Sequence, residues 1–391
     1  DLEDNHKKYR NLIILTSLII YGIYLCFIGG YGSDEDTLPM IYVFEARLES
    51  GRFVSSRFTS YPIPEIGIGF LSYFFGSWAA NSVTFVFFIL GLIFIFLSFE
   101  KELEFQKLYL FLILCFSSPI LFFENLEPMD YSWAFLFFSL GLYFFSRKYF
   151  ELAVLAFAFS VGCRLNFIIF VFLAIFFFNN NNASIQKRII LSICTFVTSG
   201  LFYLPVWFDN GFGLDWIDAA RPIEQGFIGL FARFTYKTWV AFGFIQLIII
   251  LFTFFKIFKK KIFFDNFKLL SILTIFNLLL FLYIPAELSY LQPAIIFIYI
   301  ILYKLTETKI LFFIILFNFI SWGVNFDILK VNHKENDICS PKHAISASFD
   351  LSIKKGAVNN FFETRNMINC WINSSTERGK RILKGQSTRI K

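Results

Sequence analysis

The chain has 391 residues, of which 57% are hydrophobic and 16% are charged, and 59 of them are phenylalanine. Soluble domains average about 25% charged residues, so this composition excludes an ordinary soluble protein and indicates a polytopic membrane protein. The formal net charge is +6, but the basic residues stand mostly in short loops between apolar segments, which is typical of topology control and excludes a nucleic-acid-binding protein.

Apolar segments that approach or reach the length of a membrane helix recur along the chain, whereas the period-two strands of a membrane barrel are absent. We therefore expect an all-α membrane fold of about eleven crossings. The first segment is expected to be retained, because its apolar run is long for a signal peptide and no small-residue cleavage site follows. The predicted spans are 11–29, 80–99, 108–123, 131–146, 151–162, 165–178, 188–206, 238–256, 267–284, 290–304 and 310–325.

This threading places the basic loops in the cytoplasm and both the acidic loops and the C-terminus outside. Residues 151–178 could instead form one long tilted helix, but a single crossing would put a basic loop on the wrong side. We expect interfacial helices in the outer loops, at Ile41–Leu48, Pro64–Phe75 and Phe227–Phe234.

The predicted domains are a transmembrane domain, 1–325, and a small polar extracytoplasmic region, 326–391. The second region could form a small cap or be partly disordered. It contains Cys339 and Cys370, which could form a disulfide on an oxidising side of the membrane.

Three consecutive acids, Asp34, Glu35 and Asp36, follow the first apolar segment. Acids at a membrane boundary indicate a functional site by default, and three adjacent carboxylates cannot all ionise without a compensating cation. They could therefore provide a base or a metal site. The alternative interpretation is a solvated turn that caps an interfacial helix beginning near Thr37.

A second acidic group, formed by Glu124, Glu127 and Asp130, lies in a seven-residue outer loop between two apolar helices. On the same face as the first group, these acids could ligate a divalent cation, Mg²⁺ or Mn²⁺, or position the hydroxyl groups of a sugar. The alternative is that they merely flank a turn at Pro128.

Arg164 lies between two apolar stretches, where burial without a partner would cost several kcal/mol. It needs an anion, for which Glu124, Asp130 and a lipid phosphate are the candidates; the alternative is that it snorkels to the interface. The other cations expected on the outer face are Arg57, Arg221, Arg233 and Lys237, and guanidinium groups suit phosphate oxygens well.

The order of these elements resembles the GT-C superfamily of integral-membrane glycosyltransferases, over approximately residues 1–325. The matching elements are Asp34-Glu35-Asp36 after the first helix, Ala46-Arg47-Leu48 with Gly51, Tyr61-Pro62, the loop Glu124–Asp130, Arg164 in a helix pair, and Ser289-Tyr290-Leu291-Gln292-Pro293. The last of these is similar to an Arg-Tyr-Leu-Leu-Pro element found in many members.

The resemblance implies transfer of a sugar, with inversion, from a polyprenyl-phosphate donor to a glycan, lipid or protein acceptor on the periplasmic or lumenal face. It implies that Asp34 takes the proton of the acceptor, with Glu35 or Asp36 as the alternate. Phosphate would be bound by Arg57, Arg164, Arg221 and Tyr290, and a cation or the acceptor by Glu124, Glu127 and Asp130. The bacterial inner membrane is the expected location, and the endoplasmic reticulum is also compatible.

Two other classes remain open. A transporter or flippase of a lipid-linked or small substrate predicts ionisable residues in the middle of several spans and an inverted repeat, neither of which is convincing here. A non-catalytic subunit of a membrane assembly would use the acidic loops as contact surfaces. The observation that separates these classes from an enzyme is whether the outer loops enclose a cavity on which Asp34 and Arg164 converge.

Overall fold

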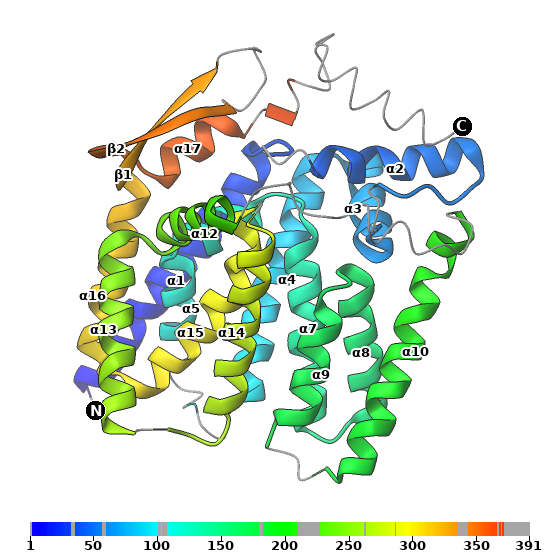
Figure 1. Ribbon diagram of the computed structural model, residues 1–391, viewed down its shortest axis with the longest axis horizontal. Helices are drawn as coiled ribbons and strands as arrows, with labels where there is room; N and C mark the ends of the chain where they lie inside the picture. The colour runs from blue at the N-terminus through cyan, green and yellow to red at the C-terminus, as the bar shows by residue number, and fades with distance from the viewer. Residues whose placement is uncertain are drawn as a thin grey trace.

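The computed structural model is a bundle of helices that run side by side between two ends (Figure 1). The N-terminus lies at the lower end in that view, and we call the opposite end, which carries α2, α12, α17 and both strands, the upper end. The residues that the structure describes are 2–32, 36–56, 60–100, 103, 108–179, 183–209, 227–261, 263–285, 287–334, 343–365, 367–368 and 370.

Each of the eleven predicted spans contains a bundle helix. These helices are α1 (Leu2–Ile28), α4 (Ser77–Ser98), α5 (Leu108–Ser117), α7 (Asp130–Ser146), α8 (Phe150–Cys163), α9 (Phe167–Phe177), α10 (Ile185–Asp209), α13 (Phe244–Lys260), α14 (Phe267–Tyr283), α15 (Gln292–Leu305) and α16 (Thr308–Gly323). By length and composition, four of the described helices can cross a membrane, or up to six if each bent pair counts as one span. The prediction of a helical membrane protein is confirmed, whereas the number of eleven crossings stays a prediction.

The core between these helices is built largely from aromatic rings. Many ring pairs are tilted or edge-to-face, for example Phe85 and Phe122 with centroids 5.9 Å apart, a geometry that aromatic quadrupoles favour. Bulky rings fill the space between helices without needing polar partners, which explains the high phenylalanine content. The fully buried phenylalanines include Phe85, Phe88, Phe96, Phe99, Phe111, Phe116, Phe122, Phe138 and Phe145.

The helices α8 and α9 form a short hairpin rather than one long helix. Phe178, just after α9, packs against Phe145 at the end of α7 with ring centroids 6.0 Å apart. The connection between α8 and α9 lies at the other end of the hairpin, where Arg164 meets Asp130. The prediction of two short helices broken near Arg164 is therefore confirmed, and short helices of this kind are tolerated where neighbouring protein shelters them.

Two sharp bends change the predicted span boundaries. The additional short elements are α6 (Pro119–Phe123), η2 (Glu124–Leu126) and α12 (Phe227–Phe242). The chain turns by 94° between α5 and α6 and by 95° between α12 and α13, so the predicted span 108–123 was too long. The first bend precedes Pro119, which has no N–H to continue α5, and the second uses Gly243, whose φ is +77°.

The helices α2 (Thr37–Ser50) and α3 (Pro62–Phe75) lie between α1 and α4, in the segment where the sequence predicted an outer loop with interfacial helices. A buried ion pair joins them, since Arg47 Nη2 lies 2.5 Å from Oε2 of Glu65, a residue that is 0% exposed. The same carboxylate accepts hydrogen bonds from Ser56, Ser60 and Tyr61. This set of donors offsets the cost of burying the charge and fixes Tyr61 at the start of α3.

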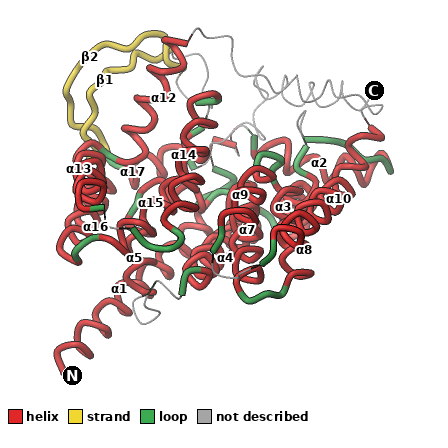
Figure 2. Tube along the Cα trace, turned by 60° about the horizontal axis from the view of Figure 1, so that its bottom comes forward, coloured by secondary structure: helices red, strands yellow, loops and turns green. Residues whose placement is uncertain are grey.

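The C-terminal region contains a β-hairpin that the all-α prediction missed. The strands β1 (Val324–Lys334) and β2 (His343–Lys355), yellow in Figure 2, pair antiparallel, and α17 (Ala357–Thr364) follows them. The signal was present, because Ile345, Ala347, Phe349, Leu351 and Ile353 alternate with mostly polar residues, a period typical of a strand. The prediction for residues 326–391 relied on their polar composition, and composition does not reveal periodicity.

Candidate functional site

The candidate site is centred on a buried ion pair at the upper end of the bundle. Arg164 Nη1 lies 3.2 Å from Oδ2 of Asp130, and the two side chains are 2% and 0% exposed. Asp130 begins α7 and Arg164 follows α8, so the pair joins the ends of two adjacent helices. Of the two carboxylate partners that the sequence left open for Arg164, Asp130 is the one that contacts it.

Three tyrosine rings surround the guanidinium group of Arg164. The distance from Cζ of Arg164 to the ring centroid is 3.6 Å for Tyr131, 4.8 Å for Tyr290 and 5.2 Å for Tyr61. Cation–π contacts of this kind stabilise a desolvated guanidinium group by about 2 kcal/mol or more. The structure therefore brings together Arg164, Asp130 and Tyr290, all three of which were predicted site residues.

The cluster extends from these tyrosines to two further acids. The hydroxyl of Tyr131 donates a hydrogen bond of 2.7 Å to Oε2 of Glu287. The pKa of Glu124 is raised first by burial and then by the negative charge of Glu287. The pair Arg164–Asp130 is thus linked through Tyr131 and Glu287 to Glu124, the second acidic group predicted from the sequence.

The protonation of Glu124 is expected to couple stability to pH. Burial and the charge of Glu287 raise its pKa from 4.5 to about 7, although Lys237 opposes the change. The folded state therefore binds the proton more tightly than the unfolded state. The resulting stability is fully present below pH 4.5 and is lost as the pH rises through about 7, by about 1 kcal/mol per pH unit at most.

Thermal unfolding of the detergent-solubilised protein between pH 5 and 8 checks this prediction. The wild type should lose stability over that interval, and the Glu124→Gln variant should lose less, because its side chain does not titrate. Equal pH dependence in the two proteins would contradict the assignment.

The residues on either side of the first acidic segment contact the loop that carries the second. A Cβ at Gly32, whose φ is +79°, would lie 2.1 Å from Cδ of Glu127, so the Glu127 side chain packs directly on the backbone that leads into the acidic triplet. On the other side of the triplet, the Thr37 hydroxyl donates to Met129 Sδ at 3.2 Å. Contacts on both flanks of residues 33–35 therefore join the segment between α1 and α4 to the loop that precedes α7.

Four of the predicted site residues, Asp34, Glu35, Arg57 and Arg221, lie outside the described residues. Asp36 is described, and it directly precedes α2 without a side-chain capping hydrogen bond. The helix does begin at Thr37, as the capping interpretation predicted, but the Asp36 side chain does not cap it. In the described part of the chain, no group of three or more His, Cys, Asp or Glu side chains is arranged to hold a metal ion.

Sequence reasoning missed three members of this cluster as functional candidates. Tyr131 and Glu287 carried a weak signal. Tyr131 directly follows Asp130, a predicted site residue, and Glu287 lies in a predicted outer loop just before the element that begins at Ser289. The involvement of Tyr61 was visible only as part of the Tyr61-Pro62 element. Nothing in the local sequence predicts that these three side chains meet around Arg164.

Comparisons with known proteins found no matching family model, no matching curated protein and no matching solved structure.

Proposed function

We propose that this protein is a membrane glycosyltransferase that moves a sugar from a polyprenyl-phosphate donor to an acceptor at the upper end of the bundle. The observation that carries the proposal is the convergence of three predicted elements: the flanks of the acidic triplet contact the loop that carries Glu127 and Asp130, and Asp130 pairs with Arg164. Carboxylates beside a fixed guanidinium group supply the base and the phosphate-binding cation that such a transfer needs.

In the proposed reaction, the acceptor hydroxyl oxygen attacks the anomeric carbon while the bond from that carbon to the phosphate oxygen breaks. The electron pair leaves with polyprenyl phosphate, and a carboxylate of Asp34, Glu35 or Asp36 takes the acceptor's proton. Attack opposite the leaving group inverts the anomeric configuration. Arg57, Arg221 and Tyr290, together with Arg164, are proposed to bind the phosphate.

Arg164 supports this assignment through an unsatisfied donor. Among the described residues, its buried Nε has no hydrogen-bond partner, although Nη1 contacts Asp130. A buried unpaired donor costs about 1–3 kcal/mol, and an anionic oxygen would remove that cost.

A divalent cation, Mg²⁺ or Mn²⁺, held by Glu124, Glu127 or Asp130 remains part of the proposal as an optional aid to the leaving group.

The proposed orientation places the upper end on the periplasmic or lumenal face, with eleven crossings and a cytoplasmic N-terminus. Basic residues follow α7 and lie in the first turn of α10, at the lower end (Figure 1), as expected at a cytoplasmic boundary. Cys370, in the C-terminal region, is disulfide-bonded, and disulfides persist in oxidising compartments. We propose the bacterial inner membrane as the location.

The direct test is transfer of radiolabelled sugar from a panel of polyprenyl-phosphate donors, using membranes that contain the expressed chain and supply acceptors. We expect label to move into a product with at least one donor, and free polyprenyl phosphate to appear in equal amount. Membranes without the chain provide the background. If no donor in the panel is consumed above that background, the proposal is contradicted.

A second candidate, a transporter or flippase of a lipid-linked substrate, is favoured by the two bent helix pairs, since discontinuous helices are common at transporter binding sites. It predicts that the chain moves a fluorescent polyprenyl-phosphate lipid between leaflets of a proteoliposome without consuming it. Testing the same donors in both assays distinguishes a transferase from a transporter.

A further inference from the structure

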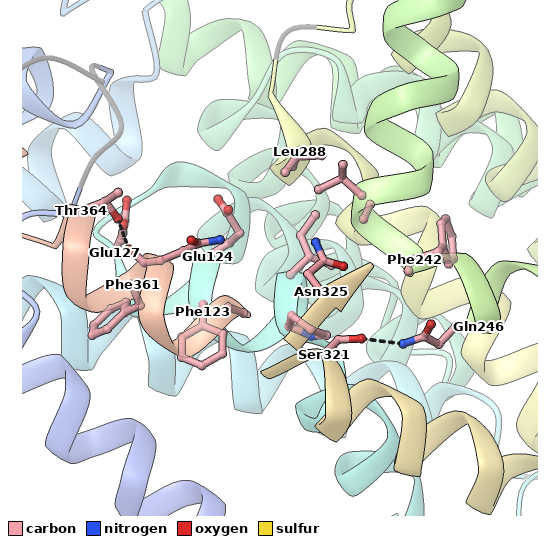
Figure 3. A pocket seen from close by; sticks show the side chains of 17 residues that line it. Phe123, Glu124, Glu127, Phe242, Gln246, Leu288, Ser321, Asn325, Phe361 and Thr364 are labelled. Carbon is pink, nitrogen blue, oxygen red and sulfur yellow. Dashed lines mark hydrogen bonds between the residues drawn. The ribbon is translucent and has the colours of Figure 1, made fainter. Parts of the chain in front are cut away.

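A pocket of about 180 Å³ opens at the upper end beside the candidate site. Figure 3 shows Glu124 and Glu127 in its lining, with Asn325 and Gln246 on one side and Thr364 of α17 on the other. The bend between α12 and α13, the end of α16 and the helix α17 thus enclose the space next to the second acidic loop.

The chemistry of the lining selects the kind of ligand. It combines two carboxylates with amide and hydroxyl side chains, and the described lining residues include no Lys, Arg or His. Carboxylates only accept hydrogen bonds when ionised, whereas amides both donate and accept. Such a surface offers phosphate no cationic side chain and suits a ligand that carries several hydroxyl or amino groups.

The size and the apolar part of the lining fit one ring. A volume of 180 Å³ corresponds to about six water molecules and is below the ~300–1,000 Å³ of pockets that hold drug-sized ligands. Phe123 and Phe361 line the same space, with ring centroids 5.7 Å apart. They offer an apolar surface to the face of a ring whose edge carries the polar groups.

The walls of the pocket are fixed before a ligand arrives. Gln246 is 3% exposed and its Nε2 donates to Ser321 Oγ at 2.9 Å. The helix α17 is anchored at both ends, because Gly356 N donates to Gly323 O at 3.0 Å and Arg365 Nη1 donates to Ile28 O at 3.0 Å. A fixed wall lowers the ordering cost of binding.

We propose that this pocket binds the ring of a neutral or amine-bearing sugar, and that α17, through Asn360 and Thr364, selects that sugar. This proposal deepens the proposed function. It rests on that function in one respect, namely that the bound ring is the glycosyl unit of a substrate. It separates two subsites, because the sugar would lie at the acidic pocket and the phosphate near Arg164. It also gives the C-terminal region, which lies outside the span of the GT-C resemblance, a part in specificity.

The test uses the full chain in lipid nanodiscs and ligand-observed NMR with three probes: methyl glucoside, glucosamine and inorganic phosphate. We expect one or both sugars to bind and phosphate not to compete with them. Asn360→Leu should weaken sugar binding about tenfold, the effect of losing one well-placed hydrogen-bonding group in the site. Asn359→Leu, the same change one residue earlier on α17 but outside the pocket lining, should change binding by less than about twofold.

Absence of sugar binding, competition by phosphate, or equal effects of the two leucine variants would overturn the pocket assignment. Both asparagines are exposed, so both variants should fold, and equal thermal unfolding midpoints confirm it. If the sugar binds in an Asn360-dependent manner but no donor is consumed in the transfer assay, the pocket assignment stands and the proposed function fails.

Discussion

Asp34→Asn is expected to lower sugar transfer by about 10²- to 10⁴-fold, the usual contribution of general acid–base catalysis. The amide keeps the size of the side chain but cannot take the acceptor's proton. Donor binding should change little, because the proposed phosphate contacts come from arginines and Tyr290. The measurement is the initial rate of label transfer at saturating donor.

Glu35→Gln and Asp36→Asn, assayed in parallel, identify which acid is the base, since the largest loss of rate marks it. Glu49→Gln is the matched control, because Glu49 is an exposed acid near the end of α2, in the same outer loop. Its rate should stay within about twofold of the wild type. Full activity in all three triplet variants would rule out the triplet as the source of the base.

Arg164→Met is expected to destabilise the protein by about 3–5 kcal/mol, because it removes the guanidinium group that pairs with the buried carboxylate of Asp130. Asp130 is 0% exposed, so water cannot replace the lost partner. The methionine side chain retains part of the contact with the surrounding tyrosine rings, which isolates the loss of the charge. The measurement is thermal or denaturant unfolding in detergent.

The double variant Arg164→Met with Asp130→Asn should recover a large part of the stability, because it also removes the buried negative charge that Arg164 balances. Arg52→Met is the control, since Arg52 is an exposed arginine at the same end of the bundle, and it should change stability by less than about 0.5 kcal/mol. If the single variant is as stable as the wild type, the assignment of Arg164 and Asp130 to a buried ion pair is contradicted.

The break at Arg164 shows where sequence reasoning succeeded. A cation between two apolar stretches needs a partner in protein, and the basic loops on either side required two crossings rather than one. Both arguments depend only on the cost of placing charge in hydrocarbon. They therefore predicted the two short helices without knowledge of their neighbours.

The bends at Pro119 and Gly243 show where reasoning from the sequence was weaker. Both residues are visible in the sequence, but an apolar segment on either side reads as one continuous span when only hydropathy is considered. The β-hairpin was missed for a related reason, since composition was used where the alternation of Ile345, Ala347 and Phe349 carried the information.

The sequence by itself determined that this is a helical membrane protein with acidic segments after the first helix and before α7. This was possible because only apolar helices are stable in hydrocarbon and charged segments are excluded from it, whatever the tertiary packing. Only the tertiary structure decided that Asp130, and not Glu124, contacts Arg164 and that Glu287 lies beside Tyr131. Those contacts join residues far apart in the chain, 156 positions in the case of Tyr131 and Glu287. They depend on how the helices pack, which no local pattern of residues encodes.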